Sequence, residues 1–348
     1  MDKKKIISII LAFALAMTFT ACGETKKELT KYSKVFCGAF DTEITLLAYC
    51  ENEESFDKLF DIALKEFVNY HKLFDIYNSY DGMINLKVVN DMAGQGPVKV
   101  DTAIIELLEY SKELYKTTGG KMNIAMGAVL RHWHDAREIA KCDVVRNILP
   151  DINLLQEDSK HCSIDDIVID RTNGTVELQD AGMSLDVGAV AKGFATEKVI
   201  DMIAQTGAKH VLINAGGNVR ALGLKPDGAK WKVGIQNPQT RGGDAYAETV
   251  DVENKSVVTS GVYERFFEFE GRRYHHIIDP DTLFPELRYQ SVTIMTEDSA
   301  LADALSTAVF NMELEEGQSF IKSMDGVEAM WILNDGSLVF SENFKNKQ

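Results

Sequence analysis

A carboxylate and a hydroxyl stand four residues apart in the segment 302–308, which reads ADALSTA. Residues at i and i+4 share one face of a helix, so Asp303 and Thr307 should lie side by side. Their neighbours are apolar, and a polar pair on a buried helix needs a partner or a ligand. Oxygen ligands of this kind suit Mg2+, so the pair predicts a magnesium site. A plain Asp–Thr hydrogen bond without metal is the alternative.

Two adjacent histidines precede a predicted turn in the segment 274–280, which reads YHHIIDP. Neighbouring residues of a strand point to opposite faces, so only one of His275 and His276 can face a site. Because a proline disfavours helical backbone in the residue before it, Asp279-Pro280 should turn the chain directly afterwards. Histidine is the usual general base in catalysis, and a hydrogen-bonded structural histidine is the alternative.

Two glycine-containing segments could bring the backbone close to an anionic ligand. Residues 183–194 (MSLDVGAVAKGF) run from a strand end into a helix start, where unpaired N–H groups can bind phosphate. Lys192 would add a positive charge there, and Asp186 would accept hydrogen bonds from a base or ribose. Residues 214–218 (NAGGN) form the second segment. Neither matches a dinucleotide or P-loop pattern, so a helix cap with packing glycines and a tight turn are the alternatives.

Hydrophobic periodicity predicts the elements that must position these residues. Apolar residues at helical spacing predict helices over 56–77, 102–115, 190–204 and 299–312, the last capped by Asp298. Alternating and β-rich runs predict strands over 36–49, 231–235, 248–252, 256–259, 265–269, 274–278 and 291–295. Helices early and strands late favour an α+β fold over a doubly wound α/β sheet. Because no linker divides the chain, we expect a single large domain.

The N-terminus has the pattern of an export signal. Three lysines at positions 3–5 precede a mostly apolar run over 6–21, which is shorter than the ~20 residues a comfortable membrane span needs. Small residues before Cys22 resemble a bacterial lipobox, so Cys22 is the expected lipidation site; ordinary cleavage with a free Cys22 is the alternative. The expected organisation is a lipoprotein signal peptide at 1–21, a tether at 22–34 and a domain at 35–342. The expected location is the extracytoplasmic face of the cell membrane.

Charge and cysteine content limit the possible ligands. The net charge of -16 argues against nucleic acid as a partner, because phosphate contacts need clustered Lys and Arg. An anionic ligand must therefore be held by local features such as a helix N-terminus, a few lysines or a metal. The remaining cysteines, Cys37, Cys50, Cys142 and Cys162, show no CxxC spacing, which argues against a zinc site. We expect them to be mostly free and buried.

Taken together, the motifs resemble those of the ApbE family of FAD:protein FMN transferases. The family pattern is matched, in order, by DVGAVAKG at 186–193, NAGG at 214–217, TSG at 259–261, HIIDP at 276–280 and ADALST at 302–307. Residues 40–46 resemble the opening strand of the family, and residues 118–123 resemble a segment that contacts flavin. The resemblance covers residues 36–340, and it is specific because five short motifs occur in register.

The resemblance implies a fold, a reaction and a set of site residues. It implies mixed or antiparallel sheets with flanking helices, and Mg2+-dependent transfer of FMN from FAD to a Ser or Thr hydroxyl of an acceptor protein. The products would be a phosphoester-linked flavin and AMP. FAD contacts fall at Tyr77, Lys121, Met122, Asn123, Asp186, Lys192 and Ile278. The metal ligands fall at Ala189 (through its carbonyl), Asp303 and Thr307, and the catalytic base falls at His276.

Departures from the family pattern occur in three places. Phe40 stands where many members have Met-Gly-Thr, so it is not counted as a ligand. Lys121-Met122-Asn123 replaces the commoner Ala-Phe-Asp, which predicts contacts to flavin through the backbone. Leu283 replaces the usual glycine after the Asp-Pro turn, which predicts a different turn shape.

A lipoprotein that binds or hydrolyses FAD without transferring FMN is an alternative function, and a solute-binding lipoprotein is another. A solute binder would need no Asp303–Thr307 pair on a buried helix.

Overall fold

A large antiparallel sheet forms the centre of the computed structural model, which describes residues 28–142, 148–239 and 245–345. Its eight strands lie in the order β1-β2-β6-β7-β10-β13-β14-β15. They are β1 (Thr30–Ala39), β2 (Thr42–Cys50), β6 (Val211–Ala215), β7 (Asn218–Leu222), β10 (Ser256–Gly261), β13 (Tyr289–Thr296), β14 (Glu328–Leu333) and β15 (Leu338–Phe340). All neighbouring pairs are antiparallel, which fits the alternating burial along β2.

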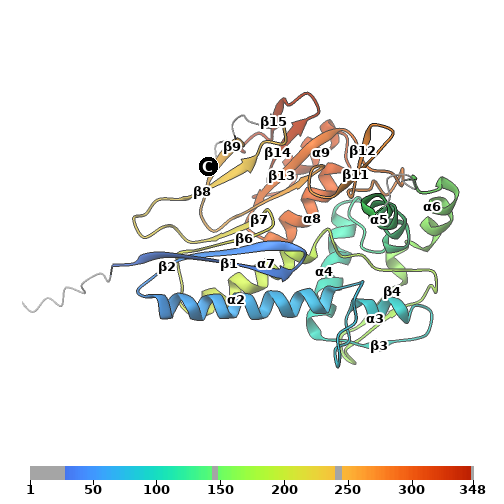
Figure 1. Ribbon diagram of the computed structural model, residues 1–348, viewed down its shortest axis with the longest axis horizontal. Helices are drawn as coiled ribbons and strands as arrows, with labels where there is room; N and C mark the ends of the chain where they lie inside the picture. Colours follow the sequence, from blue (N-terminus) through green and yellow to red (C-terminus); the bar gives the residue numbers. More distant parts are fainter. Residues whose placement is uncertain (1–27, 143–147, 240–244, 346–348) are drawn as a thin grey trace, which may run out of the picture.

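Three small sheets surround the large one. They are β3 (Val98–Lys99) with β4 (Ile167–Asp170) and β5 (Thr175–Leu178); β8 (Trp231–Gln236) with β9 (Tyr246–Val252); and β11 (Phe266–Phe269) with β12 (Arg272–His275). The helices are α2 (Glu53–Phe74), α3 (Leu86–Asp91), α4 (Thr102–Thr117), α5 (Gly127–Cys142), α6 (Ile152–Asp158), α7 (Ala191–Gln205), α8 (Ser299–Phe310) and α9 (Leu314–Lys322). Figure 1 shows α2 alongside β1 and β2, and α5 beside the β11–β12 hairpin. The α+β prediction is confirmed.

Helices α7 and α8 pack closely, and this contact positions much of the site. Gly193 makes it possible, because a Cβ there would lie 2.3 Å from the carbonyl oxygen of Ser299. The side chain of Asp298 accepts a hydrogen bond from the backbone N–H of Leu301, which confirms the predicted N-cap of α8. Glu197 of α7 accepts from the Ser299 N–H and pairs with Arg220, tying α7 to both α8 and β7.

The predicted strand over 36–49 is wrong, because the structure has two strands and a tight turn there. Phe40 and Asp41 form the turn with φ of 55° and 52°, and β1 folds back on β2. The apolar–polar alternation is interrupted between Gly38 and Glu43, and the strand prediction ran through this break. Strand β1 also begins at Thr30, inside the range 22–34 that was expected to be a tether. The expected signal peptide and Cys22 lie outside the described residues.

Other expectations are met only in part. Cys37, Cys50, Cys142 and Cys162 are all free, as predicted, but only Cys50 is buried. Leu283 has φ of 62°, in the left-handed region that favours glycine, so the backbone keeps a glycine-like conformation and gives no support to a changed turn. The carbonyl of this leucine accepts a hydrogen bond from the Trp133 indole at 2.9 Å, which helps to hold it there. Within the described ranges, no helix is long and apolar enough to cross a membrane.

Candidate functional site

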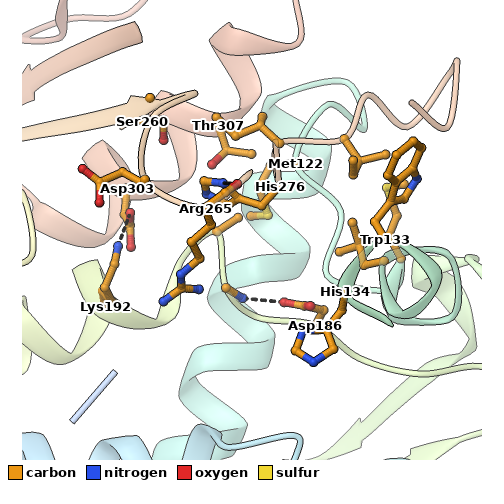
Figure 2. Close-up of a pocket in the computed structure, with 18 of the residues that line it drawn as sticks. Met122, Trp133, His134, Asp186, Lys192, Ser260, Arg265, His276, Asp303 and Thr307 are labelled. Atoms are coloured by element: carbon orange, nitrogen blue, oxygen red, sulfur yellow. Dashed lines mark hydrogen bonds and ion pairs between the residues drawn. The ribbon is translucent and has the colours of Figure 1, made fainter. Parts of the chain in front are cut away.

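A cavity of about 370 Å³ lies where α5, α8, the start of α7 and the β11–β12 hairpin meet. Its volume is in the range of pockets that bind small molecules. The structure brings together here all the residues that were expected to contact flavin, bind metal or act in catalysis. Figure 2 shows Asp303 and Thr307 on one side, Asp186 and His134 on the other, and Arg265 and His276 between them.

Asp303 is buried at the α7–α8 contact and has partners within the fold. Its Oδ2 accepts a hydrogen bond from the backbone N–H of Gly193 at 2.8 Å. Lys192 Nζ lies 3.5 Å from Oδ1, which is a loose ion pair and not a strong hydrogen bond. The carboxylate is therefore fixed in position, with Oδ1 the less firmly bound of its two oxygens.

The donor set expected for Mg2+ fits that ion chemically. Thr307 is half-buried, and within residues 28–142, 148–239 and 245–345 its hydroxyl makes no hydrogen bond, so the plain Asp–Thr bond is not found. Asp303, Thr307 and Ala189 all line the cavity and offer a carboxylate, a hydroxyl and a carbonyl oxygen. The described residues include no cluster of three or more His, Cys, Asp or Glu suited to a metal. Magnesium usually takes one or two carboxylates and completes its shell with water and substrate oxygens.

The two adjacent histidines do face opposite sides. His276 lines the cavity, whereas His275 is buried and its Nε2 lies 2.5 Å from the Glu286 carbonyl oxygen. His275 Nδ1 also accepts from the Ile277 N–H, so both its nitrogens are used within the fold. His276 Nδ1 lies 3.3 Å from the Arg265 carbonyl oxygen. Because a carbonyl can only accept, this contact places the proton on Nδ1 and leaves Nε2 able to accept one.

Desolvation in the cavity shifts the pKa of several site residues, although His276, Asp186 and His134 are each only partly buried. Desolvation, followed by the charge of Arg265, lowers the pKa of His276 to about 3, which keeps the imidazole neutral at pH 7. Desolvation raises the pKa of Asp186, although the Gly188 N–H at 2.8 Å and Arg265 oppose that shift. Burial also lowers the pKa of His134, which stacks on Tyr77 with ring centroids 4.6 Å apart. The stacked pair forms an uncharged aromatic wall of the cavity.

The segment 121–123 uses its side chains mainly within the protein. Lys121 Nζ lies 2.7 Å from Asp281 and 3.4 Å from Asp279, so its charge is neutralised at the cavity edge. Asn123 donates to the Cys162 carbonyl and accepts from the Ala125 N–H. Met122 is 1% exposed and lines the cavity. The polar side chains of Lys121 and Asn123 are therefore used within the fold, and Met122 presents an apolar surface to the cavity.

The residues that line the cavity and that sequence reasoning did not assign to it include Trp133, His134, Arg137 and Arg265. The first three belong to α5, which was not predicted. The spacing of His134 and Arg137, at i and i+3 on one helix face, is the signal that could have found them. Arg265 stands alone before a strand, and no local pattern distinguishes it from a solvated arginine.

Comparison with known proteins agrees with the fold and with the family that the motifs resemble. The ApbE family matches residues 40–331. An FAD:protein FMN transferase of Treponema pallidum is 38% identical over 264 residues, covering 72% of this chain and 71% of that protein. One of Klebsiella pneumoniae is 28% identical over 311 residues, covering 89% and 91%. The crystal structure of the ApbE protein of Thermotoga maritima superimposes with a TM-score of 0.79 at 26% identity, covering 91% and 99%. This chain belongs to the ApbE family.

Proposed function

We propose that this protein transfers FMN from FAD to a Ser or Thr hydroxyl of an acceptor protein, leaving a phosphoester-linked flavin and releasing AMP. The observation that carries the proposal is that His276 and the Asp303–Thr307 pair line one cavity. A base and a set of hard oxygen ligands are what phosphoryl transfer to a hydroxyl requires. The names of the relatives from Treponema pallidum and Klebsiella pneumoniae support the same reaction class.

In the proposed reaction, His276 Nε2 takes the proton of the acceptor hydroxyl. The hydroxyl oxygen then forms a bond to the phosphorus of the FMN half. The bond from that phosphorus to the bridging oxygen breaks, and its electron pair leaves with AMP. The Arg265 carbonyl keeps the proton on His276 Nδ1, so the other nitrogen is the one available as base.

The remaining cavity residues would bind and orient the substrate. Tyr77, Met122 and Ile278 offer aromatic and apolar surface to the isoalloxazine ring, and Lys192 offers a charge to the diphosphate. Asp303, Thr307 and the carbonyl of Ala189 would hold Mg2+, which when bound supplies positive charge that offsets the charge of the diphosphate. This arrangement lets an acidic protein bind an anionic substrate.

Incubation of the protein with FAD, Mg2+ and a candidate acceptor domain tests the proposal. Transfer yields AMP and an acceptor whose flavin label remains attached after denaturation. Release of free FMN and AMP without labelling would instead indicate an FAD hydrolase, and an unchanged FAD pool would indicate a binding protein. The acceptor is expected to be an extracytoplasmic redox subunit, because the N-terminal pattern suggests export.

The pH dependence of transfer should reflect the lowered pKa of His276. A base works when it is unprotonated, so a pKa below the ordinary 6.5 keeps His276 active through the neutral range. We expect kcat/KM for FAD, which reports the free enzyme, to stay level between about pH 8 and 6.5 and to fall only at lower pH. A value of kcat/KM that has already fallen by half at pH 6.5 or above would contradict the lowered pKa of His276.

We also propose that lipid on Cys22 anchors the protein at the extracytoplasmic face of the membrane. Cys22→Ser is expected to move the protein from the membrane fraction to the soluble fraction, because it removes the thiol that would carry the lipid. Immunoblotting of fractionated cells measures the shift, with Cys37→Ser as a matched control that should stay in the membrane fraction. Retention of Cys22→Ser in the membrane would show that another feature anchors the chain.

A further inference from the structure

Arg265 and His276 are held together by the base of the β11–β12 hairpin. Arg265 directly precedes β11 and His276 directly follows β12, and Phe266 pairs with His275 in the hairpin register. The His276 N–H donates to the Arg265 carbonyl at 3.1 Å, which closes the base of the hairpin. The residue that supplies the proposed base is therefore fixed beside an arginine, and both line the cavity (Figure 2).

Arg265 differs from the other basic side chains that line the cavity. Lys121 is paired with Asp281, and Lys192 lies 3.5 Å from Asp303. Arg137 contacts His134 at 3.0 Å. In the part of the chain that the structure describes, the guanidinium of Arg265 has no ion pair and no hydrogen bond. A guanidinium with five donors and no partner is suited to bind an anion that enters the cavity.

The position of Arg265 indicates which anion it would meet. A second cavity of about 160 Å³ adjoins the first, and Arg265, Lys192 and Asp186 line both. In Figure 2 the Arg265 side chain extends from the His276 side of the cavity toward the side of Lys192 and Asp186. A dinucleotide has a bulky group at each end and a diphosphate between them. If its two ends occupy the two cavities, its diphosphate lies at the junction.

We propose that Arg265 binds the diphosphate of FAD at the junction of the two cavities, next to the base that accepts the hydroxyl proton. This inference rests on the proposed function, because it assumes that FAD is the substrate. Guanidinium groups bind phosphate oxygens with two parallel N–H donors, so Arg265 would both hold and orient the reacting phosphate. Lys192 would approach the same diphosphate from α7 as a point charge.

Equilibrium titration with FAD, followed by quenching of flavin fluorescence, tests the proposal. Arg265→Gln is expected to raise the Kd for FAD by about 10–100-fold, because it removes charge-assisted hydrogen bonds. The Kd of Arg265→Lys for FAD should lie between those of the wild type and Arg265→Gln, because lysine keeps the charge and loses the planar pair of donors. Riboflavin, which has no phosphate, should bind Arg265→Gln as it binds the wild type. The substituted side chain leaves the carbonyl that orients His276 in place.

Arg273→Gln is the matched control, because Arg273 is on the same hairpin and does not line the cavity. It stacks on Phe266 and lies 3.9 Å from Glu268. Its Kd for FAD should equal that of the wild type, and thermal unfolding should show that all variants are folded. An unchanged Kd for FAD in Arg265→Gln would overturn the proposal while leaving the transfer reaction intact. Equal losses of FAD and riboflavin binding would overturn it too, because they would indicate a structural role.

A wild-type protein that neither binds FAD nor labels an acceptor would instead refute the proposed function. The proposed role of Arg265 would then be refuted as well. The two results are distinguishable: loss of the Arg265 proposal alone is seen as an unchanged Kd in Arg265→Gln, whereas loss of the proposed function is seen in the wild type.

Discussion

Replacing His276 by alanine is expected to lower the rate of FMN transfer by about 10²–10⁴-fold, the usual contribution of a general base. His276 lines the cavity, and its Nε2 is the nitrogen left to accept a proton. The affinity for FAD should change little, because the imidazole is neutral and its proposed partner is the acceptor hydroxyl. Single-turnover labelling of the acceptor, together with an FAD titration, separates these two quantities.

His275→Ala is the matched control for this experiment, and it should behave differently. His275 is buried and bonded to the Glu286 carbonyl and the Ile277 N–H, so its loss leaves buried groups without partners. We expect this variant to lose about 1–3 kcal/mol of stability and to keep its rate per folded molecule. A folded His275→Ala with a selective loss of transfer, beside an active His276→Ala, would reverse the assignment.

Asp303→Asn is expected to abolish Mg2+-dependent transfer while leaving the protein folded. Asparagine has nearly the same shape as aspartate, and its side-chain oxygen can still accept from the Gly193 N–H. It lacks the negative charge that a divalent cation requires from this position. This substitution is a sharper test than Asp303→Ala, which would also leave the Gly193 N–H without its partner. The measurements are acceptor labelling and the rise in Tm that Mg2+ causes.

Variants of Thr307 control for the metal assignment. Thr307→Ser keeps the hydroxyl and should retain transfer. Thr307→Ala should lower the rate of transfer less than Asp303→Asn does, because water can replace a neutral ligand. Mg2+ should raise the Tm of the wild type and of Thr307→Ser, and it should leave the Tm of Asp303→Asn unchanged. Full activity in Asp303→Asn, or a wild type indifferent to EDTA, would show that the pair does not bind a metal needed for transfer.

Local spacing was enough to predict which side chains share a face. Asp303 and Thr307 lie one turn apart on α8, and the period of a helix alone brings them to one side. The opposite orientations of His275 and His276 follow in the same way from the alternation of a strand. The N-cap at Asp298 also depends only on neighbouring residues. These relations hold wherever the element lies in the fold, so the sequence predicts them reliably.

Local spacing failed where the chain reverses between β1 and β2. Phe40 and Asp41 adopt left-handed backbone there, and Gly38, with φ of 100° at the register shift between Phe36 and Ala39, is a turn signal that the strand prediction overlooked. The pairing of the two strands stabilises the turn, and that pairing is a tertiary property. For the same reason the expected tether was too long, because the pairing of Thr30 with Cys50 extends the sheet toward the N-terminus.

Hydrophobic periodicity and motif order predict the α+β class, the one-domain organisation and the motifs that the cavity gathers. The partners of those motifs depend on the three-dimensional fold. It joins Lys121 to Asp281, 160 positions along the chain, and Asp303 to the backbone of Gly193. Among the residues that the structure describes, it also leaves the Arg265 guanidinium without an ion pair or hydrogen bond at the junction of two cavities. The physical reason is that a charge is neutralised or left available by whatever the fold brings within a few ångströms, and sequence spacing carries no information about such distant contacts.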